Sequence, residues 1–191
     1  MSVALCLQNI SRHYIKDGKD FTAVSSVDLE VQTGEFLTFL GPSGCGKTTT
    51  LRMIAGFETP SSGEILLDGE NITKVPANER DMGFVFQNYA LFPHMKIFDN
   101  VAYGLKIRRE TTDSIKKKVH EALAMVGLEN AEGNYPNQLS GGEQQRVALA
   151  RVLVLRPKII LMDEPLSNLD AKLRLHMRTE IRRIPVSYTH L

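Results

Sequence analysis

The sequence has few cysteines, no long apolar run and no excess of either charge. No apolar stretch approaches the roughly 20 residues that a membrane-spanning helix needs, and no secretory signal pattern opens the chain. We therefore expect any membrane role to come through a partner protein. The two cysteines, Cys6 and Cys45, favour reduced thiols and a cytosolic compartment. The formal net charge of +1 gives no electrostatic case for binding nucleic acid or an anionic lipid surface.

The composition is that of an ordinary globular protein. The 191 residues allow one domain, or one and part of another, and 42% of them are hydrophobic and 24% charged. Strand and helix patterns alternate, which predicts an α/β fold with a mostly parallel sheet, preceded by an N-terminal antiparallel β lobe. The predicted strands are residues 3–10, 23–31, 35–40, 64–68, 82–87 and 158–162. The predicted helices are residues 48–54, 98–105, 112–126, 143–155 and 170–184.

Residues 41–48 match the phosphate-binding pattern G-x-x-x-x-G-K-[ST] at every position. Glycines let successive backbone N–H groups turn toward phosphate oxygens, because they carry no Cβ. Lys47 would place its charge against the β and γ phosphates, and the Thr48 hydroxyl would ligate Mg²⁺. The helix that follows would direct its N-terminus at the same anion. The predicted nucleotide-binding residues of this segment are Gly41, Pro42, Ser43, Gly44, Cys45, Gly46, Lys47, Thr48 and Thr49.

Two further stretches carry related chemistry. Residues 159–164 are four apolar residues followed by Asp163 and Glu164, which predicts a buried strand that ends in two carboxylates. In a nucleoside triphosphatase, the first carboxylate belongs to the Mg²⁺ shell and the second orients or deprotonates the attacking water. A second anion-binding helix N-terminus is predicted at Ser140, Gly141, Gly142 and Glu143. A phosphate loop and a separate phosphate-capping helix in one chain suggest two copies that complete each other's sites.

Together these motifs resemble the nucleotide-binding subunit of an ATP-binding cassette (ABC) transporter, over residues 3–184. The resemblance implies a P-loop NTPase core with a helical subdomain at about residues 88–155. It also implies that the whole domain binds ATP and Mg²⁺. It implies that Glu164 is the catalytic glutamate, assisted by Lys47 and by Gln87 of the Q-loop. It further implies that Thr48, Gln87 and Asp163 hold the metal ion.

Two more residues enter the predicted nucleotide site by the same resemblance. Tyr14 stands where the family places an aromatic ring that stacks on adenine, although ordinary packing of a tyrosine at a strand end is the alternative. Asp170 falls in the D-loop, at residues 167–170. Glu143 stands where the family most often has glutamine, and a carboxylate there is expected to face the partner's nucleotide and to weaken its binding slightly.

Residues 87–95 are similar to the corresponding segment of ATPases that serve polyamine, ferric iron and sugar uptake in bacteria. In that group, the segment and the helix after it form an apolar groove for a coupling helix of the permease; core packing is the alternative. The implied partners are a second copy of the chain, transmembrane permease subunits and, indirectly, a solute-binding protein, but no nucleic acid. The implied location is the cytoplasmic face of the plasma membrane. A soluble cassette ATPase of DNA repair or translation, or an inactive fragment, are the other interpretations.

The end of the sequence departs from the family pattern. A switch histidine is implied after Glu164, but its position falls past residue 191, and His190 comes too soon after Glu164 to replace it. The last residues also match one reading frame of a transposase end used in sequencing libraries. We therefore expect an ABC ATPase domain at residues 1–184 that is incomplete at its C-terminus, and a non-native tail at residues 185–191. We also expect this chain to bind nucleotide weakly and to hydrolyse it little.

Overall fold

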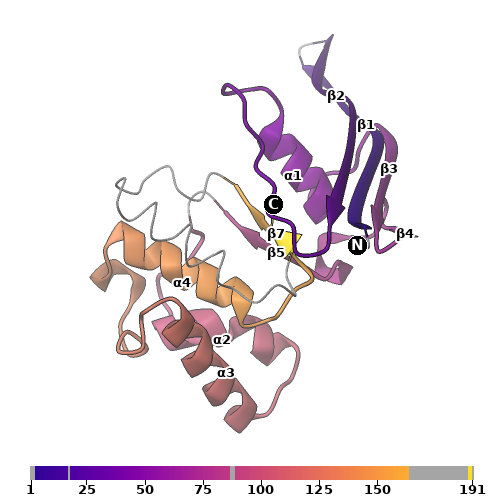
Figure 1. Ribbon diagram of the computed structural model, residues 1–191. Helices are drawn as coiled ribbons and strands as arrows, with labels where there is room; N and C mark the ends of the chain where they lie inside the picture. Colours follow the sequence, from indigo (N-terminus) through magenta and orange to yellow (C-terminus); the bar gives the residue numbers. More distant parts are fainter. Residues whose placement is uncertain (1–2, 17, 87–88, 164–188, 191) are drawn as a thin grey trace. The chain divides into compact units, whose positions relative to one another are not determined.

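The computed structural model describes residues 3–16, 18–86, 89–163 and 189–190. They form two compact units (Figure 1). Within these limits, the first unit contains residues 3–82, 158–161 and 189–190, and the second contains residues 83–157 and 162–163. In this part of the chain, no helix has the length and apolar character that crossing a membrane requires. The predictions for Gln87, Glu164 and Asp170, and for the helix at residues 170–184, fall outside the described residues.

The first unit is built on a four-stranded antiparallel sheet with the strand order β2-β1-β3-β4. Its strands are β1 (Val3–Lys16), β2 (Lys19–Gln32), β3 (Ser62–Leu67) and β4 (Glu70–Asn71). Leu5, Leu7 and Ile65 are buried on the inner face, as alternation along a strand requires. The sheet confirms the predicted antiparallel lobe and its strands at residues 3–10, 23–31 and 64–68.

The β1–β2 hairpin is longer than the apolar pattern predicts, because backbone pairing continues through polar residues to the Lys16–Lys19 pair. Asn9 and Ser26 interrupt the register with positive φ angles of 50° and 45°. Side chains hold these irregular positions. The Asn9 backbone amide donates to Asp28 Oδ1 at 2.8 Å, and the Ser26 hydroxyl donates to the side-chain oxygen Oδ1 of Asn9 at 3.1 Å. Such bulges bend and twist a hairpin locally.

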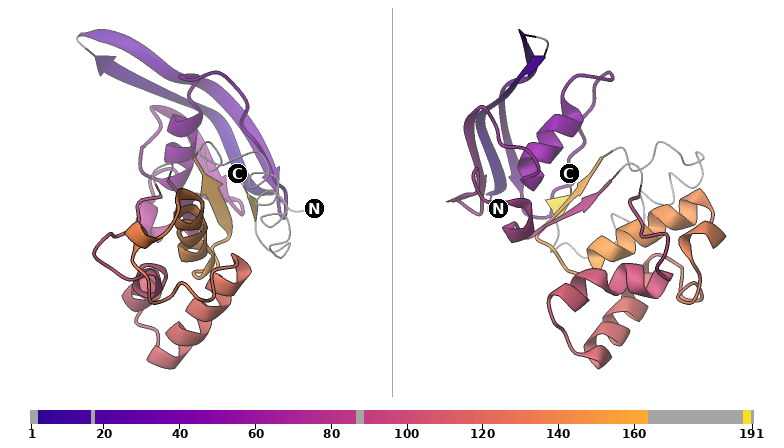
Figure 2. Two further views of the ribbon diagram at one scale, coloured as in Figure 1. Left: turned by 90° about the vertical axis from the view of Figure 1, so that its left-hand side faces the viewer. Right: turned by 180° about the vertical axis from the view of Figure 1, so that it is seen from behind.

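Helix α1 (Lys47–Ala55) lies beside β2 in the first unit (Figures 1 and 2) and confirms the helix predicted at residues 48–54. Its C-terminus is closed by Gly56, which is left-handed with φ 81°. The buried Arg80 guanidinium also donates to the carbonyls of Met53 at 2.8 Å and Ile54 at 2.6 Å. A cation at this end adds a donor to carbonyls of the last helical turn, of which Met53 also accepts the Gly56 amide at 3.1 Å, and it complements the helix dipole.

A short parallel pair is present as well. Strand β6 (Ile159–Met162) runs parallel to β7 (Thr189–His190). The first three residues of β6 are completely buried, which confirms the strand predicted at residues 158–162. Strand β7 lies in the segment that we expect to be a non-native tail, and that assignment stays a prediction.

The strand predicted at residues 35–40 is wrong. Phe36 forms an isolated bridge, and residues 37–40 have no regular secondary structure. A strand needs a neighbouring backbone to complete its hydrogen bonds, and no ladder among the described residues includes this segment. The Leu40 side chain is accordingly 90% exposed. The apolar run indicates strand character but says nothing about whether a partner strand lies beside it.

The second unit is helical. Its described α-helices are α2 (Ile97–Ile107), α3 (Thr112–Met125) and α4 (Gly141–Leu153), and they pack on one another (Figure 2). They confirm the helices predicted at residues 98–105, 112–126 and 143–155. Strand β5 (Met82–Val85) confirms the start of the strand predicted at residues 82–87. The inward faces are apolar, and the residues with no exposed surface on them include Val101, Leu105, Val119, Leu123, Val147 and Ala150.

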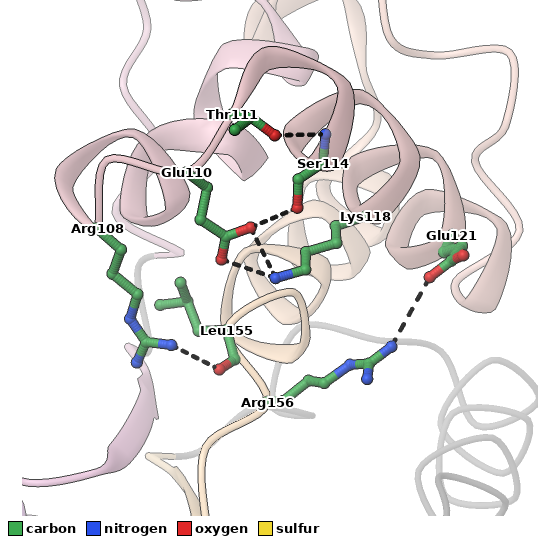
Figure 3. Close-up of polar contacts among 8 residues, drawn as sticks. All are labelled: Arg108, Glu110, Thr111, Ser114, Lys118, Glu121, Leu155 and Arg156. Carbon is green, nitrogen blue, oxygen red and sulfur yellow. Dashed lines mark hydrogen bonds and ion pairs between the residues drawn. The ribbon is translucent and has the colours of Figure 1, made fainter.

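The corner between α2 and α3 is closed by charged side chains (Figure 3). The Lys118 ammonium donates to both oxygens of Glu110 at 2.7 Å, and the Ser114 hydroxyl donates to the same carboxylate at 2.7 Å. These bonds hold the pKa of Glu110 below its ordinary value. Arg108 donates to the Leu155 carbonyl at 3.0 Å and so fastens the corner to the segment after α4.

Candidate functional site

The predicted phosphate loop leads directly into α1. Gly46 is the N-cap of this helix and has φ 92°, and a Cβ on it would lie 2.5 Å from the Ala23 carbonyl oxygen. No other residue type fits that position without displacing β2. The Thr50 amide and hydroxyl both bond to the Gly46 carbonyl, at 2.8 and 2.9 Å, and fix the first turn. Residues 41–45 are exposed, so the loop and the positive end of the helix dipole face solvent.

The Lys47 side chain folds back over this loop. Its ammonium donates to the carbonyls of Gly41 at 2.8 Å and Pro42 at 2.9 Å, and lies 3.6 Å from the Cys45 sulfur. The Thr48 side chain is exposed beside it, and Thr49 is half-buried. A cation, a hydroxyl and an open helix N-terminus are therefore gathered within one short segment. This donor set suits a polyphosphate together with a hard, oxygen-seeking cation such as Mg²⁺.

Tyr14 belongs to the same unit as the phosphate loop. It stands near the end of β1, paired with Phe21 of β2, and its ring is half-buried. The Tyr14 hydroxyl donates to the Glu58 carboxylate, and the Arg12 guanidinium lies 4.6 Å above the ring centroid. The sequence indicates an aromatic residue here but not the two charged residues that hold it.

The predicted second anion site lies at the start of α4. Ser140 is the N-cap, and its hydroxyl accepts a bond from the Glu143 amide at 3.4 Å. The Glu143 carboxylate in turn accepts bonds from the Ser140 hydroxyl at 2.6 Å and the Ser140 amide at 2.8 Å. These bonds, and the charge of Arg146, hold the pKa of Glu143 below its ordinary value. Gly141 is exposed, and a Cβ on it would meet nothing within 4 Å, so backbone there is open to a ligand.

Asp163 follows β6 as predicted, and its amide donates to the Val85 carbonyl at 3.1 Å. It is half-buried and belongs to the second unit, whereas Thr48 belongs to the first. The structure thus gathers Tyr14 and residues 41–49 in one unit, and residues 140–143 and Asp163 in the other. The remaining predicted site residues lie outside the described part of the chain.

A hollow of about 710 Å³ lies on the second unit, near the segment predicted to meet a permease. Tyr103 and Ile107 line it with apolar surface, and both are exposed. Its charged lining residues are Lys96, Asp99 and Lys106, of which Asp99 and Lys106 form an ion pair at 2.6 Å. The other lining residues are His94, Met95 and Tyr135.

Two residues that the sequence did not single out shape the segment leading into this hollow. Asn100, which is completely buried, accepts a bond from the Phe92 amide at 2.8 Å and donates to the Phe92 carbonyl at 3.1 Å. Arg151 of α4 donates to the carbonyls of Ala90 at 2.7 Å and Tyr89 at 3.1 Å. Neither has a sequence signature, because their partners are backbone groups.

Comparison with known proteins defines the class. A family model described as ABC transporter matches residues 24–167, which include the phosphate loop, the Ser140 helix N-terminus and Asp163. The chain therefore belongs to the ABC transporter family, as the motifs predicted.

The curated proteins similar to this chain include ATP-binding proteins of import systems. The spermidine/putrescine import ATP-binding protein PotA of Mesoplasma florum is 49% identical over 178 residues, which cover 93% of this chain and 50% of that protein. The Fe(3+) ions import ATP-binding protein FbpC 1 of Rhizobium meliloti is 54% identical over 175 residues, which cover 92% and 50%. The chain spans about half the length of these curated relatives.

Solved structures confirm the fold, an α/β P-loop NTPase cassette with an antiparallel lobe and a helical subdomain. The ATP-binding cassette MJ0796, as a dimer in a post-hydrolysis state bound to ADP and Pi, matches with a TM-score of 0.87 and 32% identity, over 97% of this chain and 86% of that one. The cbiO1 protein of Clostridium perfringens, part of the ABC transporter complex cbiONQ, matches with a TM-score of 0.89 and 28% identity, over 100% and 77%.

Proposed function

We propose that this chain is the ATP-binding part of a bacterial ABC importer ATPase, which couples hydrolysis of Mg-ATP to solute uptake through partner permeases. The observation that carries the proposal is the phosphate loop, where the Lys47 ammonium, the exposed Thr48 hydroxyl and the N-terminus of α1 occupy one segment. Family membership and the relatives' import functions support it. The polyamine, ferric iron and sugar classes are the solutes that the resemblance favours.

In this proposal each group of residues has its own role in binding or hydrolysis. Backbone N–H groups of the loop and the Lys47 ammonium bind the β and γ phosphates, and Tyr14 supports the adenine ring. Thr48, Gln87 and Asp163 would hold Mg²⁺, which neutralises charge on the phosphates when bound. Glu164 orients the water and accepts its proton. The reaction needs mainly positioning and charge stabilisation, which these groups supply.

The proposed active form is a dimer. Gly141 presents open backbone at the N-terminus of α4, where a phosphate can be bound. We assign that phosphate to ATP held by the loop of a second copy, with Asp170 of the D-loop as a further proposed nucleotide-binding residue. The dimeric neighbour bound to ADP and Pi supports this arrangement.

The hollow on the second unit is the proposed contact with the membrane subunit. Its exposed Tyr103 and Ile107 suit the apolar side of a short helix, and its charged lining residues suit the polar groups of that helix. We assign its occupant as a coupling helix of a permease, which would hold the chain at the cytoplasmic face of the membrane. A solute-binding protein would act indirectly, on the far side of the permease.

Nucleotide titration tests the first part of the proposal. We expect the chain to bind Mg-ATP, and Lys47→Ala to weaken binding by at least about tenfold, since it removes a charge-assisted contact. Lys116→Ala, which removes an exposed lysine on α3, is the matched control and should bind normally. Equal affinities for the two variants would contradict the assignment of the loop.

Capture from membranes of the source cell tests the second part. We expect the chain to retain a multi-span permease, and Tyr103→Glu to lose it while still binding Mg-ATP. Retention of repair or translation factors in place of a permease would favour a non-transport ATPase instead.

A further inference from the structure

The segment that follows α1 is fastened along β1, close to Tyr14. The Ser61 amide donates to the Ser11 carbonyl at 2.8 Å, and the His13 amide donates to the Ser61 hydroxyl at 3.0 Å. The Arg12 guanidinium donates to the Thr59 carbonyl at 2.9 Å. Residues 11–13 of β1 are therefore bonded to Thr59 and Ser61 of the segment after the helix. Glu58 immediately precedes Thr59 and is bonded to Tyr14.

Glu58 makes several contacts of its own in this region. Its carboxylate accepts the Tyr14 hydroxyl and lies 3.6 Å from Arg12 Nε and 3.7 Å from an Arg52 guanidinium nitrogen. Its side chain is only 19% exposed, so these bonds compete with little water. Its backbone amide also donates to the Arg52 carbonyl in α1, at 3.3 Å. The ring of Tyr14 is thus tied to the helix that begins at Lys47.

We propose that Glu58 is a positioning residue that fixes the Tyr14 ring for stacking against the purine base of the bound nucleotide. The proposal rests on the proposed function, in which Tyr14 meets that base. A tyrosine near the end of a strand can rotate about its side-chain bonds, and the entropy lost when a ligand orders it weakens binding. The bond to Glu58 orders the ring in advance. Arg12 covers one face of the ring, which leaves the opposite face for the base.

The arrangement also joins two parts of the nucleotide site through one rigid element. The phosphate loop lies at the N-terminus of α1, and Glu58 is held to the last turns of the same helix. The spacing between the base-stacking ring and the phosphate-binding loop is then set by the helix rather than by the flexible end of the hairpin. This spacing affects the binding only of ligands that carry both a base and a polyphosphate.

The test compares two ligands, Mg-ATP and Mg-tripolyphosphate, by calorimetric titration of the whole chain. Glu58→Met removes the acceptor at similar length, Glu58→Gln keeps an acceptor, and Tyr14→Phe keeps the ring but removes the hydroxyl. We expect Glu58→Met and Tyr14→Phe each to weaken ATP binding by about three- to tenfold, the range expected for a lost aromatic stack. Glu58→Gln should retain most of the affinity, and all variants should bind tripolyphosphate like the wild type.

The double variant separates positioning from a general loss of structure. Glu58→Met combined with Tyr14→Phe should bind ATP no more weakly than either single variant, because both remove the same bond. Losses of ATP affinity that add, equal losses for ATP and tripolyphosphate, or unchanged ATP affinity in Tyr14→Phe would each overturn the proposal. A wild-type chain that binds neither ligand would contradict the proposed function itself, a result distinct from these.

Discussion

The Glu143 carboxylate accepts both donors of Ser140, the hydroxyl at 2.6 Å and the backbone amide at 2.8 Å. This is a reciprocal capping box, because the Glu143 amide also donates to the Ser140 hydroxyl. The side chain that the family resemblance places against a partner's nucleotide is thus turned onto the start of its own helix. Any phosphate that takes the Ser140 hydroxyl must first displace this carboxylate.

Substitutions at this cap should affect stability in a graded way. We expect Ser140→Ala to lower the free energy of unfolding by about 1 kcal/mol, the usual value of a helix N-cap. Ser140→Thr keeps a hydroxyl that can both accept from the Glu143 amide and donate to its carboxylate, so we expect its loss to be smaller. Chemical denaturation measures both. Equal destabilisation by alanine and threonine would show that the cap contributes little.

The low pKa of Glu110 predicts a specific dependence on pH. Its folded pKa lies below the unfolded value because Lys118 and Ser114 donate to it. Its contribution to stability is therefore fully present above the unfolded pKa and is lost as the pH falls through the folded pKa. Glu110→Gln should destabilise the chain at neutral pH, and this difference should vanish in acid. Melting curves from pH 7 downward provide the measurement, and a difference that grows in acid would contradict the assigned contacts.

Among the charged residues of the first unit, we expect substitution of Arg80 to lower the free energy of unfolding the most. It is buried and donates to four carbonyls, those of Met53, Ile54, Val75 and Thr73. Arg80→Met keeps the length but removes all four of these hydrogen bonds, so we expect a loss of about 3 kcal/mol in unfolding free energy. The exposed Arg109→Met is the matched control and should change stability by less than about 0.5 kcal/mol. Similar losses in the two variants would refute this role.

Arg151 is predicted to hold the backbone that leads into the hollow. Tyr89 and Ala90 have φ angles of 57° and 46°, an uncommon conformation for residues other than glycine, and Arg151 donates to both of their carbonyls. Arg151→Lys keeps the charge but cannot make this forked contact. We expect faster amide hydrogen exchange in residues 89–92 of this variant, with little change at residues 115–123 of α3. Uniformly faster exchange would indicate general destabilisation instead.

The sequence predicted correctly those elements whose formation depends on residues close together in the chain. The phosphate loop has a fixed spacing, and the apolar face at Ile115, Val119 and Leu123 indicates α3 from its own residues. The prediction of a strand at residues 35–40 was wrong because strand formation depends on a neighbouring strand, which an apolar run cannot reveal. Leu40, apolar yet exposed, shows this directly.

Charged residues that bind backbone groups could not be recognised in the sequence. Arg80 and Arg151 look like ordinary surface charges, but both donate to carbonyls, and the Ala90 partner of Arg151 lies 61 residues away. Glu58 has a similarly distant partner in Tyr14, 44 residues earlier. Long-range contacts of this kind follow from the packing of the chain and carry no local pattern.

The most direct test of the central claim, that the loop at residues 41–48 binds Mg-ATP, uses the thiol inside it. Cys45 is exposed and its sulfur lies 3.6 Å from the Lys47 ammonium, whereas Cys6 is half-buried in β1 and serves as an internal control. Alkylation by N-ethylmaleimide can be followed at each cysteine by peptide mass spectrometry. At ten times its Kd, Mg-ATP should slow labelling of Cys45 about tenfold and leave Cys6 unchanged, and Lys47→Ala should reduce the slowing to about twofold or less at the same ATP concentration. Equal labelling rates of Cys45 with and without saturating Mg-ATP would contradict the account.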